Sequence, residues 1–129
     1  MDIPADRRYS QTHQWARLGS DGSVAVGITH HAQDLLGDMV FVESPPVGRK
    51  LKTGEQCGVV ESVKSASDIY APLSGEVSAI NRDLDTAPEK LNENAYETWI
   101  FKLTPADESE LASLLDAEAY RKLIETQTA

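Results

Sequence analysis

The stretch GVVESVKSASDIYAPLSGEV, residues 58–77, decides the fold of this chain. It opens with an apolar run, passes through a short polar tip that contains Lys64, and returns as a second extended run that ends at Pro72. Runs of β-branched and apolar residues that flank a few small polar residues are typical of paired strands. The stretch therefore predicts a β-hairpin with Lys64 at its tip.

The side chains next to Lys64 are small or uncharged. Val63 precedes it, and Ser65, Ala66 and Ser67 follow it. A lysine at a hairpin tip is most often a solvated charge. The open surroundings of Lys64 also suit an enzyme that grips the tip and modifies the amine, and the residues alone leave both interpretations open.

Further extended runs on both sides of this hairpin predict a mainly β protein. Turn-forming residues such as Gly, Pro, Asn and Asp separate the runs. Similar units of extended chain and turn lie before and after Lys64, which fits a flattened barrel of two related halves joined by its hairpin. The predicted strands cover residues 15–18, 23–28, 38–43, 56–63, 67–71, 76–80 and 98–103.

Three helices are expected around this sheet structure. Thr29 is a candidate N-cap for a short helix that runs to Leu36, and Gly37 is its predicted stop. Near the C-terminus, leucines 111, 114 and 115 recur at helical spacing, and so do the apolar residues 120, 123 and 124. We expect two short helices here that cover one face of a sheet, with Asp116 as the N-cap of the second.

Apolar side chains in the predicted strands are candidates for the core. The large aromatic residues Trp15, Phe41, Trp99 and Phe101 are all expected to be buried. Cys57 lies in an extended apolar run and is expected to act as a small packed side chain.

Composition bounds the function. The chain has 129 residues, enough for one domain over residues 1–129. It carries 12 Lys and Arg against 21 Asp and Glu, a net charge of −9, which argues against binding to nucleic acid or to an anionic membrane surface. With a single cysteine, neither an internal disulfide nor a cysteine-based zinc site is expected. The N-terminus has no hydrophobic leader, so the bacterial cytoplasm is the expected compartment. We also expect the chain to be a monomer.

Motifs that would indicate catalysis are missing from the sequence. There is no glycine-rich phosphate loop, no GxSxG and no HExxH. The three histidines are His13 and the adjacent pair His30 and His31, and adjacent residues on a helix point apart, so no metal site is predicted. The chain is therefore expected not to be an enzyme.

Six motifs together carry a resemblance to a known family. They are THQW at 12–15, VGIT at 26–29, AQDLLGD at 32–38, VFVE at 40–43, VESVK at 60–64 and IYAPLSGEV at 69–77. The chain closely resembles the H proteins of the glycine cleavage system, which are lipoyl carriers, from Tyr9 to about Leu123. The resemblance implies a flattened lipoyl-type barrel, also called a barrel-sandwich hybrid.

The resemblance also implies that Lys64 carries lipoic acid in amide linkage. A lipoate ligase or lipoyl transferase would attach it, and Glu61 matches an acidic position of the family that we expect this enzyme to recognise. As a plain strand-end carboxylate, Glu61 would be merely solvated. A hairpin between paired strands supplies the rigid base that a swinging arm needs.

The enzymes that use such an arm are also implied by the resemblance. A glycine decarboxylase with pyridoxal phosphate would load an aminomethyl group from glycine. An aminomethyltransferase would pass its carbon to tetrahydrofolate, and a dihydrolipoyl dehydrogenase with FAD would reoxidise the dithiol. The chain itself would be their shared substrate.

The cargo on such an arm is labile in water, so we expect the loaded arm to fold into a groove beside the hairpin. The candidate groove residues are Thr12, Gln14, Leu35 and Asp68. Asp68 is the only charged one, and its alternative role is to cap the turn after Lys64. Many relatives have Glu in place of Gln14, and the loop at 95–99 is shorter than theirs and lacks their glycines.

One alternative function remains open, and two others fit the residues poorly. A lipoate carrier of another pathway, such as sulfur oxidation or lipoyl relay, would present the same Lys64. A biotin carrier usually has Met on both sides of its lysine, where this chain has Val63 and Ser65. A small hydrolase would need a catalytic constellation that the sequence lacks.

Overall fold

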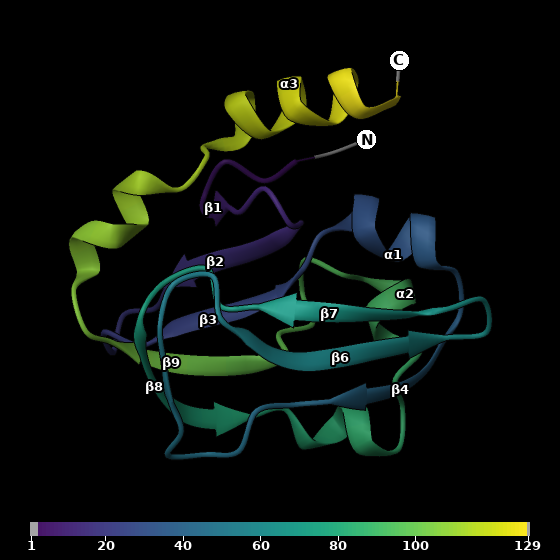
Figure 1. Ribbon diagram of the computed structural model, residues 1–129, viewed down its shortest axis with the longest axis horizontal. Coiled ribbons are helices and arrows are strands. Elements are labelled where there is room, and N and C mark those ends of the chain that lie inside the picture. Colours follow the sequence, from purple (N-terminus) through teal and green to yellow (C-terminus); the bar gives the residue numbers. More distant parts are fainter. Residues whose placement is uncertain (1–2, 129) are drawn as a thin grey trace.

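The computed structural model describes residues 3–128, which form two antiparallel β-sheets with short helices around them (Figure 1). The larger sheet has the strand order β1-β2-β3-β9-β8-β5, and the smaller one has the order β4-β6-β7. The strands are β1 (Arg8–Tyr9), β2 (Gln14–Leu18), β3 (Val24–Ile28), β4 (Met39–Glu43), β5 (Lys50–Leu51), β6 (Gln56–Ser62), β7 (Ala66–Tyr70), β8 (Gly75–Ile80) and β9 (Phe101–Pro105). The predicted mainly β fold is confirmed.

The first half of the chain follows the sequence patterns closely. β2 and β3 pair as the predicted hairpin. Helix α1 (His30–Leu36) begins where the Thr29 hydroxyl accepts a hydrogen bond from the amide of Ala32 at 3.2 Å. It ends at Gly37, whose amide donates to the carbonyl of Gln33 at 2.9 Å. Local capping chemistry is sufficient to fix both ends of this helix.

The last strand begins later than expected, at Phe101 rather than at residue 98. The Thr98 hydroxyl instead donates to the carbonyl oxygens of Lys90 and Asn94, and so closes helix α2 (Lys90–Glu93). The Asn81 amide holds the carbonyl of Trp99 at 2.8 Å. These side-chain bonds reach between 4 and 18 residues along the chain, and strand periodicity does not report them. The short helix η1 (Arg82–Asp85), like α2, was not expected.

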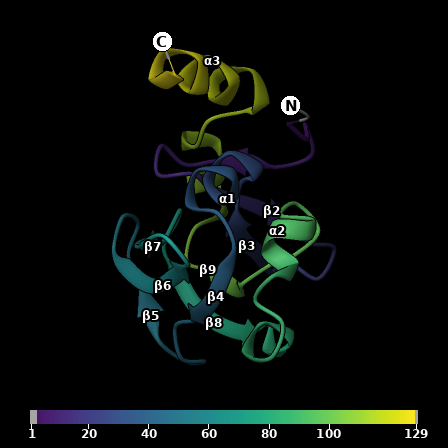
Figure 2. The same cartoon turned by 90° about the vertical axis from the view of Figure 1, so that its right-hand side faces the viewer.

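The two C-terminal helices differ from each other. Segment η2 (Glu108–Ser113) is a 3-10 helix, and α3 (Ala117–Thr128) is an α-helix whose predicted N-cap is confirmed, since Asp116 accepts from the amide of Ala119 at 2.8 Å. Figure 2 shows that α3 lies over the N-terminal segment, where it meets the edge strand β1 rather than a broad sheet face. None of the helices within residues 3–128 is both long and apolar enough to cross a membrane.

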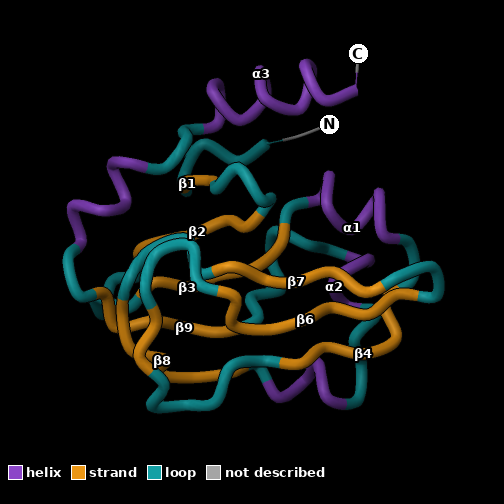
Figure 3. Tube along the Cα trace, viewed as in Figure 1, coloured by secondary structure: helices purple, strands orange, loops and turns teal. Residues whose placement is uncertain are grey.

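The core has two parts. The main cluster fills the space between the two sheets, which Figure 3 draws as facing layers of strands. A second cluster joins Tyr9 and Trp15 to Tyr120 beneath α3. Burial of Trp15, Phe101 and Cys57 is confirmed.

Two of the expected core residues lie elsewhere. Phe41 is 51% exposed, because the register between β4 and β6 shifts between Met39 and Phe41 and turns consecutive side chains outward. Trp99 is only partly buried, with the Lys102 ammonium 4.8 Å above its ring.

Candidate functional site

Lys64 lies at the exposed tip of the β6–β7 hairpin, as predicted. The buried Ser62 holds this tip from below. Its hydroxyl accepts hydrogen bonds from the amides of Lys64 at 3.2 Å and Ser65 at 3.1 Å, and donates to the carbonyl of Ser65 at 3.0 Å. The turn that bears Lys64 is therefore held in place by the Ser62 side chain as well as by the hydrogen bonds between the two strands.

The tip is also attached to the end of α1. The amide of Val63 donates to the carbonyl of Asp38 at 3.0 Å. Gly37 has a φ of 84°, which strongly favours glycine, and a β-carbon built there would lie 2.9 Å from Cε of Lys64. Gly37 thus ends helix α1 and also leaves room for the aliphatic part of the Lys64 side chain.

Charge around the tip is almost entirely negative. In residues 34–43 and 59–68, Lys64 is the one basic residue against five exposed carboxylates. These carboxylates belong to Asp34, Asp38, Glu43, Glu61 and Asp68. An amide on Lys64 would leave these two segments without a positive side chain.

The expected groove residues do not all come together. Gln14 is 2% exposed, and its side-chain oxygen accepts from the hydroxyls of Ser10 and Thr12. Its amide nitrogen donates to the carbonyl of Thr12 at 3.0 Å. The amide of Gln14 therefore organises its own loop, and Thr12 is the exposed member of the pair.

The other two expected residues flank the hairpin from different elements. Leu35 lies on the last turn of α1 and is 61% exposed. Asp68 lies on β7, where the Tyr70 hydroxyl donates to its carboxylate at 3.4 Å. Ser62, rather than Asp68, caps the turn that contains Lys64.

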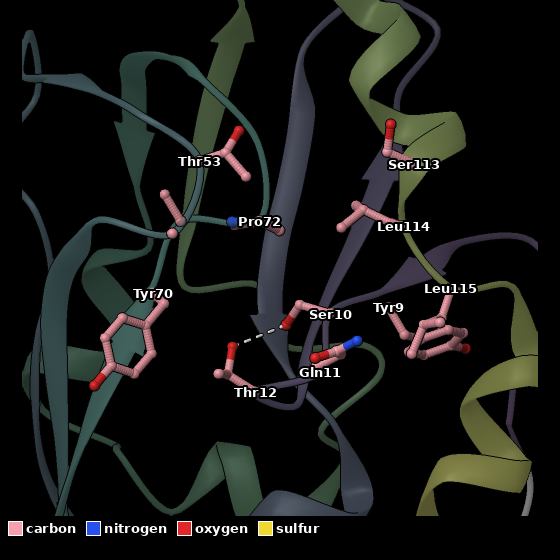
Figure 4. A pocket seen from close by; sticks show the side chains of 12 residues that line it. Tyr9, Ser10, Gln11, Thr12, Thr53, Tyr70, Pro72, Ser113, Leu114 and Leu115 are labelled. Carbon is pink, nitrogen blue, oxygen red and sulfur yellow. Dashed lines mark hydrogen bonds between the residues drawn. The ribbon is translucent and has the colours of Figure 1, made fainter.

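A pocket of about 470 Å³ opens beyond Asp68, at the end of β7 (Figure 4). Thr12 lines it from the β1–β2 loop and Tyr70 from β7, with Leu114 and Leu115 on the C-terminal side. Of the expected groove residues, Thr12 alone lines this pocket. Tyr70 was not predicted, because an aromatic residue in a strand normally indicates core.

Neither the single cysteine nor a metal-binding cluster supplies a second reactive site among the described residues. Burial raises the pKa of the Cys57 thiol to about 11, and this thiol donates to the carbonyl of Ile69. Cys57 is therefore inert at neutral pH. Residues 3–128 contain no cluster of three or more His, Cys, Asp or Glu residues that could hold a metal ion.

Sequence reasoning missed two residues that shape the tip. Ser62 is one of many small polar residues in this stretch, and nothing in its spacing distinguishes it. Gly37 was predicted only as a helix stop, although its positive φ and the lysine stem both require the absence of a side chain.

Comparisons with known proteins agree on one family. A family model described as glycine cleavage H-protein matches residues 7–127. The glycine cleavage system H proteins of Thiobacillus denitrificans and Nitrosomonas eutropha are 58% and 60% identical, each over 98% of both chains. The crystal structure of an H protein from Mycobacterium marinum superposes with a TM-score of 0.85 at 34% identity, covering 98% of this chain and 100% of that one. This chain belongs to the glycine cleavage H-protein family, the lipoyl carriers of the glycine cleavage system.

Proposed function

We propose that Lys64 is the residue that carries lipoic acid, and that this chain is a non-catalytic shared substrate made of one carrier domain. The observation that carries the proposal is the position of Lys64: an exposed amine at the tip of a pinned hairpin, with its stem passing over Gly37. The lysine nitrogen forms an amide with an activated lipoyl donor, whose leaving group departs while the amine proton goes to solvent. When bound, lipoic acid supplies a dithiolane that can carry a one-carbon amine fragment and two electrons.

The proposed partners are the enzymes of the glycine cleavage system. They are a pyridoxal-phosphate glycine decarboxylase, a tetrahydrofolate-dependent aminomethyltransferase, an FAD-containing dihydrolipoyl dehydrogenase and a lipoate ligase or lipoyl transferase. The relatives that support this assignment come from bacteria, and the proposed compartment is the bacterial cytoplasm. Glu61, exposed beside the tip, is proposed as a contact of the attaching enzyme.

Replacing Lys64 tests the attachment site. Wild-type protein incubated with a lipoate ligase, ATP and lipoate should gain one lipoyl group by intact mass, mapped to Lys64. Lys64→Arg keeps the positive charge but offers no acylatable amine, so it should fold normally and gain no mass. Lipoylation of Lys64→Arg would contradict the proposal.

The pathway is tested with the decarboxylase of the same organism. The lipoylated protein should support exchange of bicarbonate into glycine, and the unlipoylated protein should not. If lipoylated protein fails with a matched decarboxylase that accepts another H protein, the carrier serves a different lipoate-dependent pathway.

Protection of the cargo is proposed for the surface between Lys64 and Thr12. Asp68 lies on β7 between the tip and the pocket, and its carboxylate suits a protonated amine. Leu35 supplies apolar cover from α1, the Thr12 hydroxyl supplies a polar contact, and Gln14 positions Thr12. Excluding water from the cargo would slow its hydrolysis.

Two substitutions test this protection. Asp68→Asn and Leu35→Ser should each release formaldehyde from the loaded protein several-fold faster than wild type, measured by trapping the aldehyde over time. Equal lipoylation and equal thermal stability are checked first. If neither variant releases formaldehyde faster, these residues do not protect the cargo and the attachment at Lys64 is unaffected.

A further inference from the structure

Exposed apolar side chains gather at the end of the molecule that bears Lys64. The described residues leave six large apolar side chains exposed, and three of them, Val40, Phe41 and Val63, lie along β4 and the hairpin tip. Single exposed apolar residues are ordinary, but a contiguous group of them commonly marks an interaction site. We call these three residues the hairpin patch.

Backbone contacts bring the hairpin patch together. Val63 is joined to the start of β4, because its amide donates to the carbonyl of Asp38 at 3.0 Å. Along β4, Met39 pairs with Ser62 and Phe41 with Glu61. The irregular register between Met39 and Phe41 leaves both Val40 and Phe41 exposed, although neighbours on a regular strand would face opposite sides. Bulges often re-aim side chains beside functional sites.

The negative charge near the patch favours a partner surface that carries positive side chains. The five exposed carboxylates at 34–43 and 59–68 make the segments that carry the patch and Lys64 strongly negative. A complementary surface would place apolar side chains at its centre and Lys or Arg at its edge, since charge complementarity steers encounter and fixes orientation.

The length of the unmodified side chain selects one enzyme among the proposed partners. Before lipoylation, the amine of Lys64 lies only one lysine stem away from the hairpin backbone. An enzyme that acylates this amine must therefore bring its active site directly onto the tip. Enzymes that use the finished arm meet a longer chain and can stay farther from β4.

Resting on the function proposed above, we infer that the hairpin patch docks the lipoyl-attaching enzyme through an apolar surface edged by basic side chains. The patch contributes binding and orientation, and the chemistry stays at the Lys64 nitrogen. Val40, Phe41 and Val63 are thus positioning residues for the modification of Lys64.

Acylation kinetics with the unlipoylated full chain test this inference. Phe41→Ser and Val63→Ser should each raise the KM of a lipoate ligase for the protein about tenfold and leave kcat within about twofold, because docking surface is lost and the amine is kept. Val47→Ser is the matched control: Val47 is 57% exposed, but it follows Pro46 in a loop outside β4 and the hairpin. Its KM should equal that of wild type.

Salt and charge provide a second measurement. Raising ionic strength should lower kcat/KM for wild-type protein several-fold, since exposed charges are screened. The double variant Glu43→Gln/Glu61→Gln should start from a lower kcat/KM and depend less on salt. The control Glu97→Gln removes an exposed carboxylate elsewhere and should retain the wild-type salt dependence.

Each other outcome overturns the inference in a recognisable way. Phe41→Ser and Val63→Ser that fold normally and match Val47→Ser in KM would show that the patch does not dock the enzyme. A wild-type dimer in sedimentation that Phe41→Ser abolishes would assign the patch to a second copy of the chain. Absence of acylation in wild-type protein would instead refute Lys64 as the attachment site, and this inference with it.

Discussion

Ser62 shows how a single side chain determines the presentation of Lys64. Its hydroxyl makes three hydrogen bonds to the backbone of residues 64 and 65 from a buried position. A tip held in this way presents the lysine from a fixed base, which lowers the cost of ordering the turn when an enzyme grips it. If Lys64 carries the proposed lipoyl arm, part of the rigidity at the base of that arm comes from this one serine.

Ser62→Ala should loosen this tip. Loss of the hydroxyl leaves two backbone amides without their acceptor, and should lower the free energy of unfolding by about 1–2 kcal/mol. Denaturant unfolding measures the loss, and amide hydrogen exchange at Lys64 and Ser65 should become faster. Ser65→Ala, an exposed change on the same turn, should leave both measurements close to wild type. An unchanged exchange rate in Ser62→Ala would show that strand pairing alone holds the tip.

The C-terminal helix α3 is attached to the first strands by a buried polar network. The Tyr120 hydroxyl lies 2.7 Å from Nδ1 of His13 and 2.7 Å from the Thr29 hydroxyl. The Tyr120 ring stacks on that of Tyr9 at 4.7 Å, and burial raises the pKa of both phenols. Because Leu115, just before α3, lines the pocket at the end of β7, docking of this helix also completes a wall of that pocket.

Acid should weaken this docking through His13. Burial, and then the neighbouring His31, lower the pKa of His13 below its ordinary value of 6.5, while a hydrogen bond with Gln127 opposes the shift. The unfolded chain therefore binds a proton more readily than the folded one. Stability should fall as the pH drops below about 6.5, and level off only below the lowered folded-state pKa.

Unfolding measured by denaturant between pH 7.5 and 5 checks this expectation. His13 has a φ of 70°, a conformation that Asn adopts well, so His13→Asn keeps the backbone and removes the titration. Its stability should change less over this pH range than that of wild type, whereas His30→Gln, at an exposed position, should retain the wild-type slope. A wild-type slope in His13→Asn would assign the pH dependence to other groups.

At the scale of the whole molecule, the two sheets have different roles. The larger sheet supplies most of the buried framework, together with the edge strand against which α3 packs. The smaller sheet carries the Lys64 hairpin, and its outward side chains include Phe41, Glu61 and Asp68. A rigid body with one projecting tip suits the proposed role of Lys64, in which its amine enters the active site of an attaching enzyme.

The sequence by itself was enough to predict the mainly β fold, the hairpin with Lys64 at its tip and the helix from Thr29 to Gly37. These features depend on interactions between residues near in sequence: turn chemistry, strand patterning and helix caps. The motifs also predicted the family that the comparisons confirm.

Only the tertiary structure decided which apolar residues stay outside and which polar ones are buried. Four consecutive apolar residues, 39–42, give no alternation that would separate Phe41 from the core, and a register shift against β6 exposes it. Gln14 looked like a groove residue, yet Ser10 and Thr12 enclose its amide. Thr98 looked like strand, yet it closes α2. The exposure of Phe41 depends on a separate strand, whereas Gln14 and Thr98 bond groups only 2 to 8 residues away in irregular loops and helix ends. Strand and helix periodicity report neither kind of contact, because both depend on how the folded backbone places the partner atoms.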